Sequence, residues 1–141
     1  MSNYSGSCHC GVLSVRYQTD LQLSAWSLRA CQCTFCRRHG ALSTSDPQGE
    51  IAFQASDETR LVRYRFGMRT ADFLICGGCG VYLGTQTQSP AGRIAVLNVR
   101  CLLLNESDLP ARQPMHYEAE SPESRLARRQ ARWTPVARDS L

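Results

Sequence analysis

The segment LICGGCGVYL, residues 74–83, places two cysteines three positions apart in an otherwise apolar run. Thiolates at this spacing suit a tetrahedral zinc ion, because a tight turn aims both sulfur atoms at one point with Zn–S distances of about 2.3 Å. The glycines between and directly after the cysteines permit such a turn, since glycine accepts positive φ and its bare backbone lets amide N–H groups approach the sulfurs. The runs on either side, residues 73–76 and 81–87, are typical of the two arms of a hairpin. The segment therefore predicts a β-hairpin that ends in a metal knuckle.

The rest of the 141-residue chain repeats this feature, because seven of its eight cysteines fall into three short groups. Disulfide frameworks join cysteines that lie far apart in sequence, and a bridge across one intervening residue is strained. These spacings therefore favour metal sites over four disulfides. The groups are Cys8 and Cys10, then Cys31, Cys33 and Cys36, then Cys76 and Cys79, and the remaining cysteine is Cys101.

The three groups supply two, three and two metal ligands. A closed structural zinc site needs four ligands, so the two pairs can form one such site and leave the triplet over. The triplet is one ligand short, and three protein ligands with an open fourth position are the arrangement of a catalytic zinc. Two residues can instead close the triplet site: His39, which lies three positions beyond Cys36, and the distant Cys101. The count alone leaves an open and a closed second site as alternatives.

The composition limits where the protein acts and on what. No run approaches the roughly 18 consecutive apolar residues of a membrane span, and the polar start MSNYSGSCHCG lacks the regions of a secretory signal. We therefore expect a cytoplasmic protein with reduced thiols and no membrane partner. The formal net charge is +4, but seven thiolates subtract seven charges and two zinc ions add four, which leaves +1. So small an excess argues against a nucleic-acid partner.

Between the cysteine groups the chain is typical of short strands. Only the tail has helical character, because Ser121 suits an N-cap, Pro122 suits the first helical position and good helix formers follow. Its strong apolar residues, Leu126 and Trp133, predict a surface helix near 122–133. We expect residues 1–141 to form one mainly β domain, since no linker or repeat divides the chain. The strand patterns occur in residues 11–19, 25–30, 50–54, 61–66 and 93–104.

The ordered cysteine pattern resembles the family of glutathione-dependent formaldehyde-activating enzymes over residues 7–104. The motifs that carry the resemblance are SCHCG at 7–11, CQCTFCRRHGAL at 31–42 and LICGGCGVYL at 74–83. The resemblance implies an all-β fold of several small antiparallel sheets, often called a β-tent. The implied reaction, a carbon–sulfur lyase activity, joins glutathione to formaldehyde as S-hydroxymethylglutathione and can run in reverse. The implied metals are a structural zinc on Cys8, Cys10, Cys76 and Cys79 and a catalytic zinc on Cys31, Cys33 and Cys36.

An open zinc site with three thiolates fits this reaction, because the metal lowers the pKa of a thiol in the fourth position and makes it a nucleophile. Glutathione is anionic, so we expect Arg37 and Arg38, which directly follow the triplet, to bind one of its carboxylates, with His39 beside them. The partners are then a small thiol, glutathione or a similar one, and formaldehyde or another small aldehyde. The competing interpretation is a non-catalytic, zinc-stabilised binding module for a protein or nucleic-acid partner. It predicts a closed second zinc site and a broad exposed patch.

Overall fold

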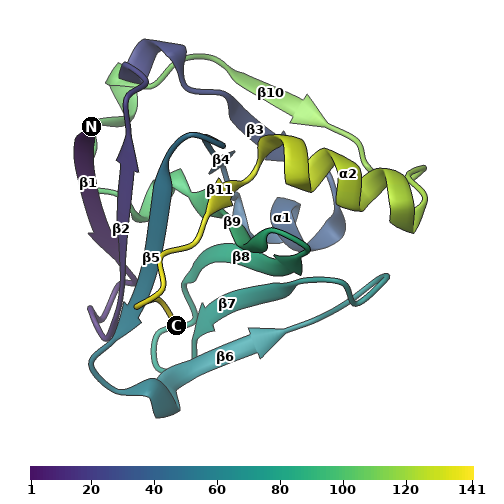
Figure 1. Cartoon of the computed structure of the whole chain (residues 1–141). Helices are drawn as coiled ribbons and strands as arrows, with labels where there is room; N and C mark the ends of the chain where they lie inside the picture. Colours follow the sequence, from purple (N-terminus) through teal and green to yellow (C-terminus); the bar gives the residue numbers. More distant parts are fainter.

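The structure, a computed structural model, describes all 141 residues and is mainly β, as the sequence predicts. A three-stranded antiparallel sheet lies on one side of the molecule and a larger sheet fills the rest (Figure 1). The small sheet has the order β1 (Ser2–Ser7), β2 (Leu13–Thr19) and β5 (Glu50–Ala55). The large sheet has the order β10 (Arg112–Met115), β3 (Leu28–Cys31), β4 (Ser43–Thr44), β9 (Gly92–Asn98), β8 (Tyr82–Ser89), β7 (Asp72–Cys76) and β6 (Leu61–Tyr64), and β11 (Thr134–Pro135) also pairs with β9. All pairs in it are antiparallel except β10 with β3, which is parallel.

The core lies between the two sheets. Side chains of β2 alternate between buried and half-buried positions, because successive residues of an extended chain point to opposite faces. Leu13, Val15, Tyr17 and Thr19 are the buried ones, and the first three belong to the hydrophobic core. Phe53 of β5 and Leu97 of β9 belong to the same cluster of buried side chains, so one core joins both sheets.

The predicted hairpin around the glycine knuckle is confirmed, since β7 and β8 pair antiparallel on either side of it. The predicted run 93–104 is shorter as a strand, because β9 ends at Asn98. The side chain of Asn98 accepts a hydrogen bond from the backbone N–H of Arg100 at 3.3 Å and caps a 3-10 turn over Val99–Cys101. A side chain that offers the backbone such a local bond competes with the strand.

The cysteine triplet contains a helix that the sequence patterns did not predict, α1 (Thr34–His39). Its N-cap is Cys33, whose sulfur accepts the backbone N–H of Cys36 at 3.3 Å. Gly40 ends the helix in the left-handed conformation, with φ of 60°, which glycine adopts without steric cost. Six residues are too few for a hydrophobic period, so only the two caps mark this helix in the sequence.

The predicted C-terminal helix is present as α2 (Pro122–Arg132), with Ser121 as its N-cap. The hydroxyl of Ser121 accepts the backbone N–H of Ser124 at 3.1 Å. Of the two apolar residues expected to dock this helix, only Trp133 is buried, whereas Leu126 is 37% exposed. After α2 the chain enters β11, which pairs with β9 of the large sheet. The helix therefore lies on the side of the molecule opposite the small sheet (Figure 1). Neither α-helix has the length and apolar character of a membrane-crossing helix.

Candidate functional site

The two cysteine pairs predicted to share one metal come together, although they are far apart in sequence. The sulfur atoms of Cys8, Cys10, Cys76 and Cys79 all lie within 4.8 Å of one another. Cys10 Sγ lies 3.6 Å from the sulfur of Cys8 and 3.6 Å from that of Cys76. Ligands at 2.3 Å from a tetrahedral zinc are about 3.8 Å apart. The group therefore fits zinc in both ligand number and spacing.

Backbone N–H groups point at these sulfurs, as the glycines of the knuckle predict. Leu13 donates to Cys8 Sγ at 3.3 Å, and Gly78 donates to Cys76 Sγ at 3.3 Å. Gly80, with φ of 81°, lets the chain turn back into β8. Such donors stabilise thiolates, so the two loops are prepared for a cation and would bind the start of the chain to the β7–β8 hairpin.

The triplet forms a second, separate group. Cys31 ends β3, Cys33 caps α1, and Cys36 lies in the first turn of that helix, with all three sulfurs within 4.8 Å of one another. No further histidine, cysteine or carboxylate joins this group. The ring of His39 instead packs against that of Phe35, with centroids 4.4 Å apart. The geometry thus gives three protein ligands for one metal.

Cys101, the other candidate for closing the triplet, is engaged elsewhere. It is buried, and its thiol donates to the carbonyl oxygen of Tyr82 at 3.2 Å. Burial raises its pKa to about 12, which keeps it a neutral thiol. We therefore interpret Cys101 as a packing residue.

The three sulfurs of the triplet share protons as a unit. Hydrogen bonds from Cys31 and Cys36 hold the pKa of Cys33 well below its ordinary value, and hydrogen bonds to Cys31 and Cys33 raise the pKa of Cys36. Only part of the group is ionised without a cation, because three adjacent thiolates repel one another. A divalent metal that replaces the protons satisfies all three sulfurs, so the donor set fits zinc.

A cavity of about 80 Å³ adjoins the triplet, beneath α2. It opens next to a larger cleft of about 420 Å³ that shares Cys31 and Cys33 as lining residues. The aromatic side chains of Phe73, Tyr82 and Trp133 give the inner cavity apolar walls. Its polar lining consists of Arg29, Ser43, Thr85, Tyr117, Arg128 and Arg129.

Tyr82 lines this cavity and carries a hydroxyl group. Its side chain is buried, and its hydroxyl lies 2.6 Å from that of Thr85. Burial raises the pKa of Tyr82, and the nearby Cys36 raises it further. The phenol therefore stays protonated at neutral pH and remains available as a hydrogen-bond donor.

The structure places the predicted substrate-binding residues away from this cavity. Arg37 and Arg38 are exposed and border a separate depression together with Thr34. They follow Cys36 on a helix, where adjacent residues point in directions about 100° apart, so they turn away from the sulfurs. His39 is exposed and packs on Phe35. None of the three lines either cavity beside the triplet.

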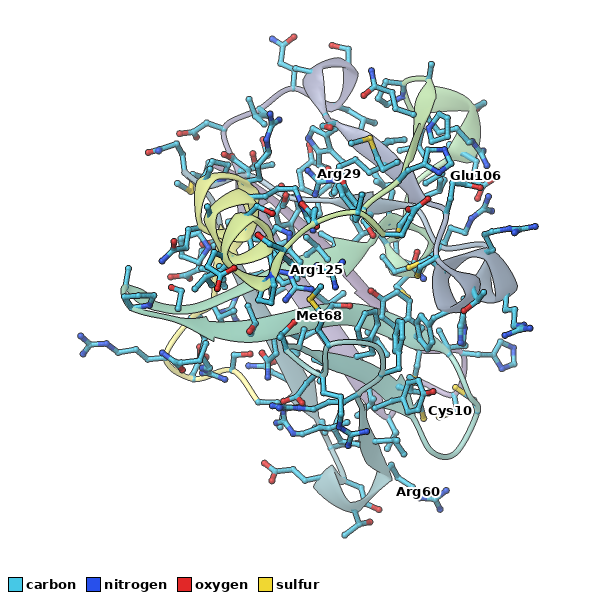
Figure 2. All side chains as sticks on the ribbon, turned by 90° about the vertical axis from the view of Figure 1, so that its right-hand side faces the viewer. Cys10, Arg29, Arg60, Met68, Glu106 and Arg125 are labelled. Carbon is cyan, nitrogen blue, oxygen red and sulfur yellow. The ribbon has the colours of Figure 1, made fainter.

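The cationic lining comes instead from arginines that sequence reasoning missed. Arg29 precedes Cys31 by two positions on β3, so both side chains share one face of the strand. Arg125, Arg128 and Arg129 line the two cavities from α2, at a spacing that places them on one helix face. In Figure 2, Arg29 of β3 and Arg125 of α2 both lie well away from Cys10 of the four-cysteine group. Both spacings are visible in the sequence, but only the docking of α2 connects them with the triplet.

Comparisons with known proteins agree with this architecture. The family model described as glutathione-dependent formaldehyde-activating enzyme matches residues 3–118. The crystal structure of a Rhodobacter sphaeroides protein is 32% identical in sequence, with a TM-score of 0.59, and the match covers 77% of this chain and 99% of that one. The comparison with curated proteins finds no match. Because the family match spans most of the chain and both cysteine groups, this protein belongs to the family of glutathione-dependent formaldehyde-activating enzymes.

Proposed function

We propose that the protein is a zinc-dependent carbon–sulfur lyase-type enzyme that condenses glutathione, or a similar thiol, with formaldehyde or another small aldehyde. The product is the S-hydroxymethyl adduct or its homologue, and the reaction also runs in reverse. The observation that supports this proposal is the triplet, which has three ligands and no fourth and lies against a cavity. This is the arrangement of a catalytic rather than a structural zinc site.

Each cysteine group receives its own role in this proposal. Cys8, Cys10, Cys76 and Cys79 would hold a structural zinc that fixes the start of the chain to the β7–β8 hairpin. Cys31, Cys33 and Cys36 would hold the catalytic zinc. A zinc ion bound there would lower the pKa of a thiol that enters the open position.

The other groups of the cavity would bind and orient the reactants. The larger cleft has room for a tripeptide-sized thiol, and Arg125 and Arg128 at its lining attract an anionic one. When sulfur attacks the carbonyl carbon, negative charge develops on the aldehyde oxygen. Tyr82 lines the same cavity, and its protonated hydroxyl would donate a hydrogen bond to that oxygen. Phe73 and Trp133 keep bulk water away from the reacting atoms.

The competing function, a zinc-stabilised binding module for a protein or nucleic-acid partner, predicts a closed second site. The positions of His39 and Cys101 do not favour it, since both have other partners. We propose that the protein acts in a reducing compartment such as the cytoplasm. Its eight cysteines, all free thiols, agree with this location.

The test measures metal content and thiol binding in one preparation. We expect two zinc ions per chain in the reduced protein, and one in a Cys33→Ser variant that remains folded. With cobalt in place of zinc, glutathione should change the visible spectrum of the wild type, and S-methylglutathione, which has no free thiol, should not. Exchange NMR should then show faster interconversion of glutathione and S-hydroxymethylglutathione than in buffer. Two metal ions that are both indifferent to glutathione would contradict the proposal.

A further inference from the structure

Two arginines beside the triplet, the buried Arg129 and the half-buried Arg29, have no carboxylate partner. Arg129 is only 8% exposed; its Nη1 donates to the hydroxyl of Thr70 at 2.9 Å, and its Nε has no partner. Arg29 donates from Nη2 to the hydroxyl of Ser45 at 2.6 Å. Neither guanidinium takes part in an ion pair. A buried cation with only neutral partners is costly, so Arg129, with Arg29 lining the same cavity, indicates a bound anion.

The neighbouring arginines on α2, Arg125 and Arg128, do have a carboxylate partner. Glu120 Oε2 lies 2.6 Å from Nε of Arg128, and Glu120 Oε1 lies 3.2 Å from Nε of Arg125. That carboxylate is therefore already engaged and lines neither cavity. A zinc ion on three thiolates would leave one negative charge, which balances at most one of Arg29 and Arg129. The inner cavity retains an excess of positive charge.

The size of the inner cavity limits what this anion is. A volume of about 80 Å³ compares with roughly 10–15 Å³ for one water on the same measure, so the ligand has only a few non-hydrogen atoms. A tripeptide does not fit there, whereas it fits the adjoining cleft of about 420 Å³. The aromatic walls of Phe73, Tyr82 and Trp133 suit a small flat molecule.

We infer that the inner cavity binds the carboxylate of the aldehyde substrate between Arg29 and Arg129, so that the preferred electrophile is a small aldehyde acid such as glyoxylate. This inference rests on the proposed function. The thiol sulfur forms a bond to the aldehyde carbon, the carbonyl π pair moves to oxygen, and the thiol proton ends on that oxygen. The product is a hydroxy-thioether carboxylate, and no oxidant or reductant is consumed. Guanidinium pairs bind a carboxylate well, because they offer parallel donors.

The two arginines come from different parts of the chain. Arg29 lies on β3 within the matched family segment, whereas Arg129 and Trp133 lie beyond its last matched residue, 118. The helix α2, which lies outside the matched segment, adds a cation and an apolar wall to the triplet site of this chain. Such an addition changes which aldehyde fits without changing the metal ligands.

The experiment compares two aldehydes and two thiols on the zinc-loaded protein. We expect kcat/KM with glutathione to be higher for glyoxylate than for formaldehyde, after subtraction of the uncatalysed rate. Arg129→Gln should lower the glyoxylate-to-formaldehyde ratio about 10- to 100-fold, the usual effect of losing a charged hydrogen bond. If Arg129→Gln does not fold, Arg29→Gln replaces it and should lower the glyoxylate-to-formaldehyde ratio by a similar factor. Arg132→Gln, an exposed arginine of the same helix, is the matched control and should leave the ratio unchanged.

Replacing glutathione by 2-mercaptoethanol, which has no carboxylate, identifies the source of the anion. The aldehyde preference and its loss in Arg129→Gln should persist with this thiol. An arginine effect that appears only with glutathione, and equally for both aldehydes, would assign the anion to the thiol and overturn the inference. Turnover of formaldehyde without preference for glyoxylate overturns the inference but supports the proposed function. No turnover of either aldehyde overturns both, even where calorimetry detects glyoxylate binding that Arg129→Gln removes.

Discussion

The side-chain amide of Asn98 donates a hydrogen bond to the carbonyl oxygen of Tyr82 at 2.9 Å. Its oxygen accepts the backbone N–H of Leu42 at 3.3 Å, so one buried side chain joins β8, β9 and the segment that follows the triplet. Tyr82 lines the cavity and α1 precedes Leu42. The position of the cavity wall relative to the cysteines therefore depends on Asn98.

Replacing Asn98 by alanine should destabilise the protein by about 2–4 kcal/mol, because it leaves the buried N–H of Leu42 without its partner and removes a donor from Tyr82. Chemical denaturation of the zinc-loaded protein measures this loss. Asn105→Ala is the control, since Asn105 is exposed and its side chain makes no capping bond. Equal stability of the two variants would show that the buried amide does not hold these segments.

The parts of the structure that the sequence predicted are those specified by neighbouring residues. The β7–β8 hairpin follows from its glycine knuckle, and α2 follows from the Ser121 cap and Pro122. The grouping of the cysteines was also predictable, because the ligand number of zinc restricts the ways in which seven thiols can be divided.

The cavity was not predictable, because it depends on how a distant helix docks. Leu126 suggested one buried face of α2, but the buried residues are Arg129 and Trp133. The pairing of Thr134 with Ala95 fixes the end of the helix, and the guanidinium of Arg129 packs over the Trp133 ring at 4.8 Å. An arginine that enters the interior contradicts the usual hydrophobic pattern, so sequence periodicity assigns it to solvent.

The two metal sites should differ in their effect on folding. Cys76→Ser should lose one zinc and the cooperative fold, because its site joins residues 66 positions apart and structural zinc contributes about 10–16 kcal/mol in small modules. Cys33→Ser should lose one zinc with a smaller decrease in Tm, since its ligands lie close together in the chain. Cys101→Ser should keep both ions. Metal analysis with thermal unfolding measures all three, and equal destabilisation by the first two variants would contradict the assignment.

Gly84 of β8 lies close to the backbone of the adjacent strand β9 and to Phe53 of the small sheet. A Cβ at this position would stand 2.4 Å from the carbonyl oxygen of Val96 and 2.8 Å from Cζ of Phe53. The first neighbour is backbone and cannot rotate away, so Gly84→Ala should cost about 2 kcal/mol or more in unfolding free energy. Gln88→Ala, at an exposed position of the same strand, should change stability by less than about 0.5 kcal/mol. A Gly84→Ala protein as stable as this control would refute the close approach.

Glu120, which pairs with two arginines of α2, should make the stability of this segment sensitive to acid. Hydrogen bonds from Arg128, with a further contribution from Arg125, lower the pKa of Glu120. A carboxyl group whose pKa is lowered in the folded protein stabilises the folded state. Its full contribution is present above its ordinary pKa of about 4.5, and it disappears as the pH falls through the lowered pKa of the folded state. The free energy of unfolding of the wild type should therefore exceed that of Glu120→Gln by about 1 kcal/mol at pH 7. This difference should shrink between about pH 5 and pH 3. Zinc release in acid weakens both proteins alike, so the difference in unfolding free energy isolates Glu120. Glu118→Gln serves as the control, because the side chain of Glu118 is 76% exposed. A difference between wild type and Glu120→Gln that does not change with pH would rule out this ionic contribution.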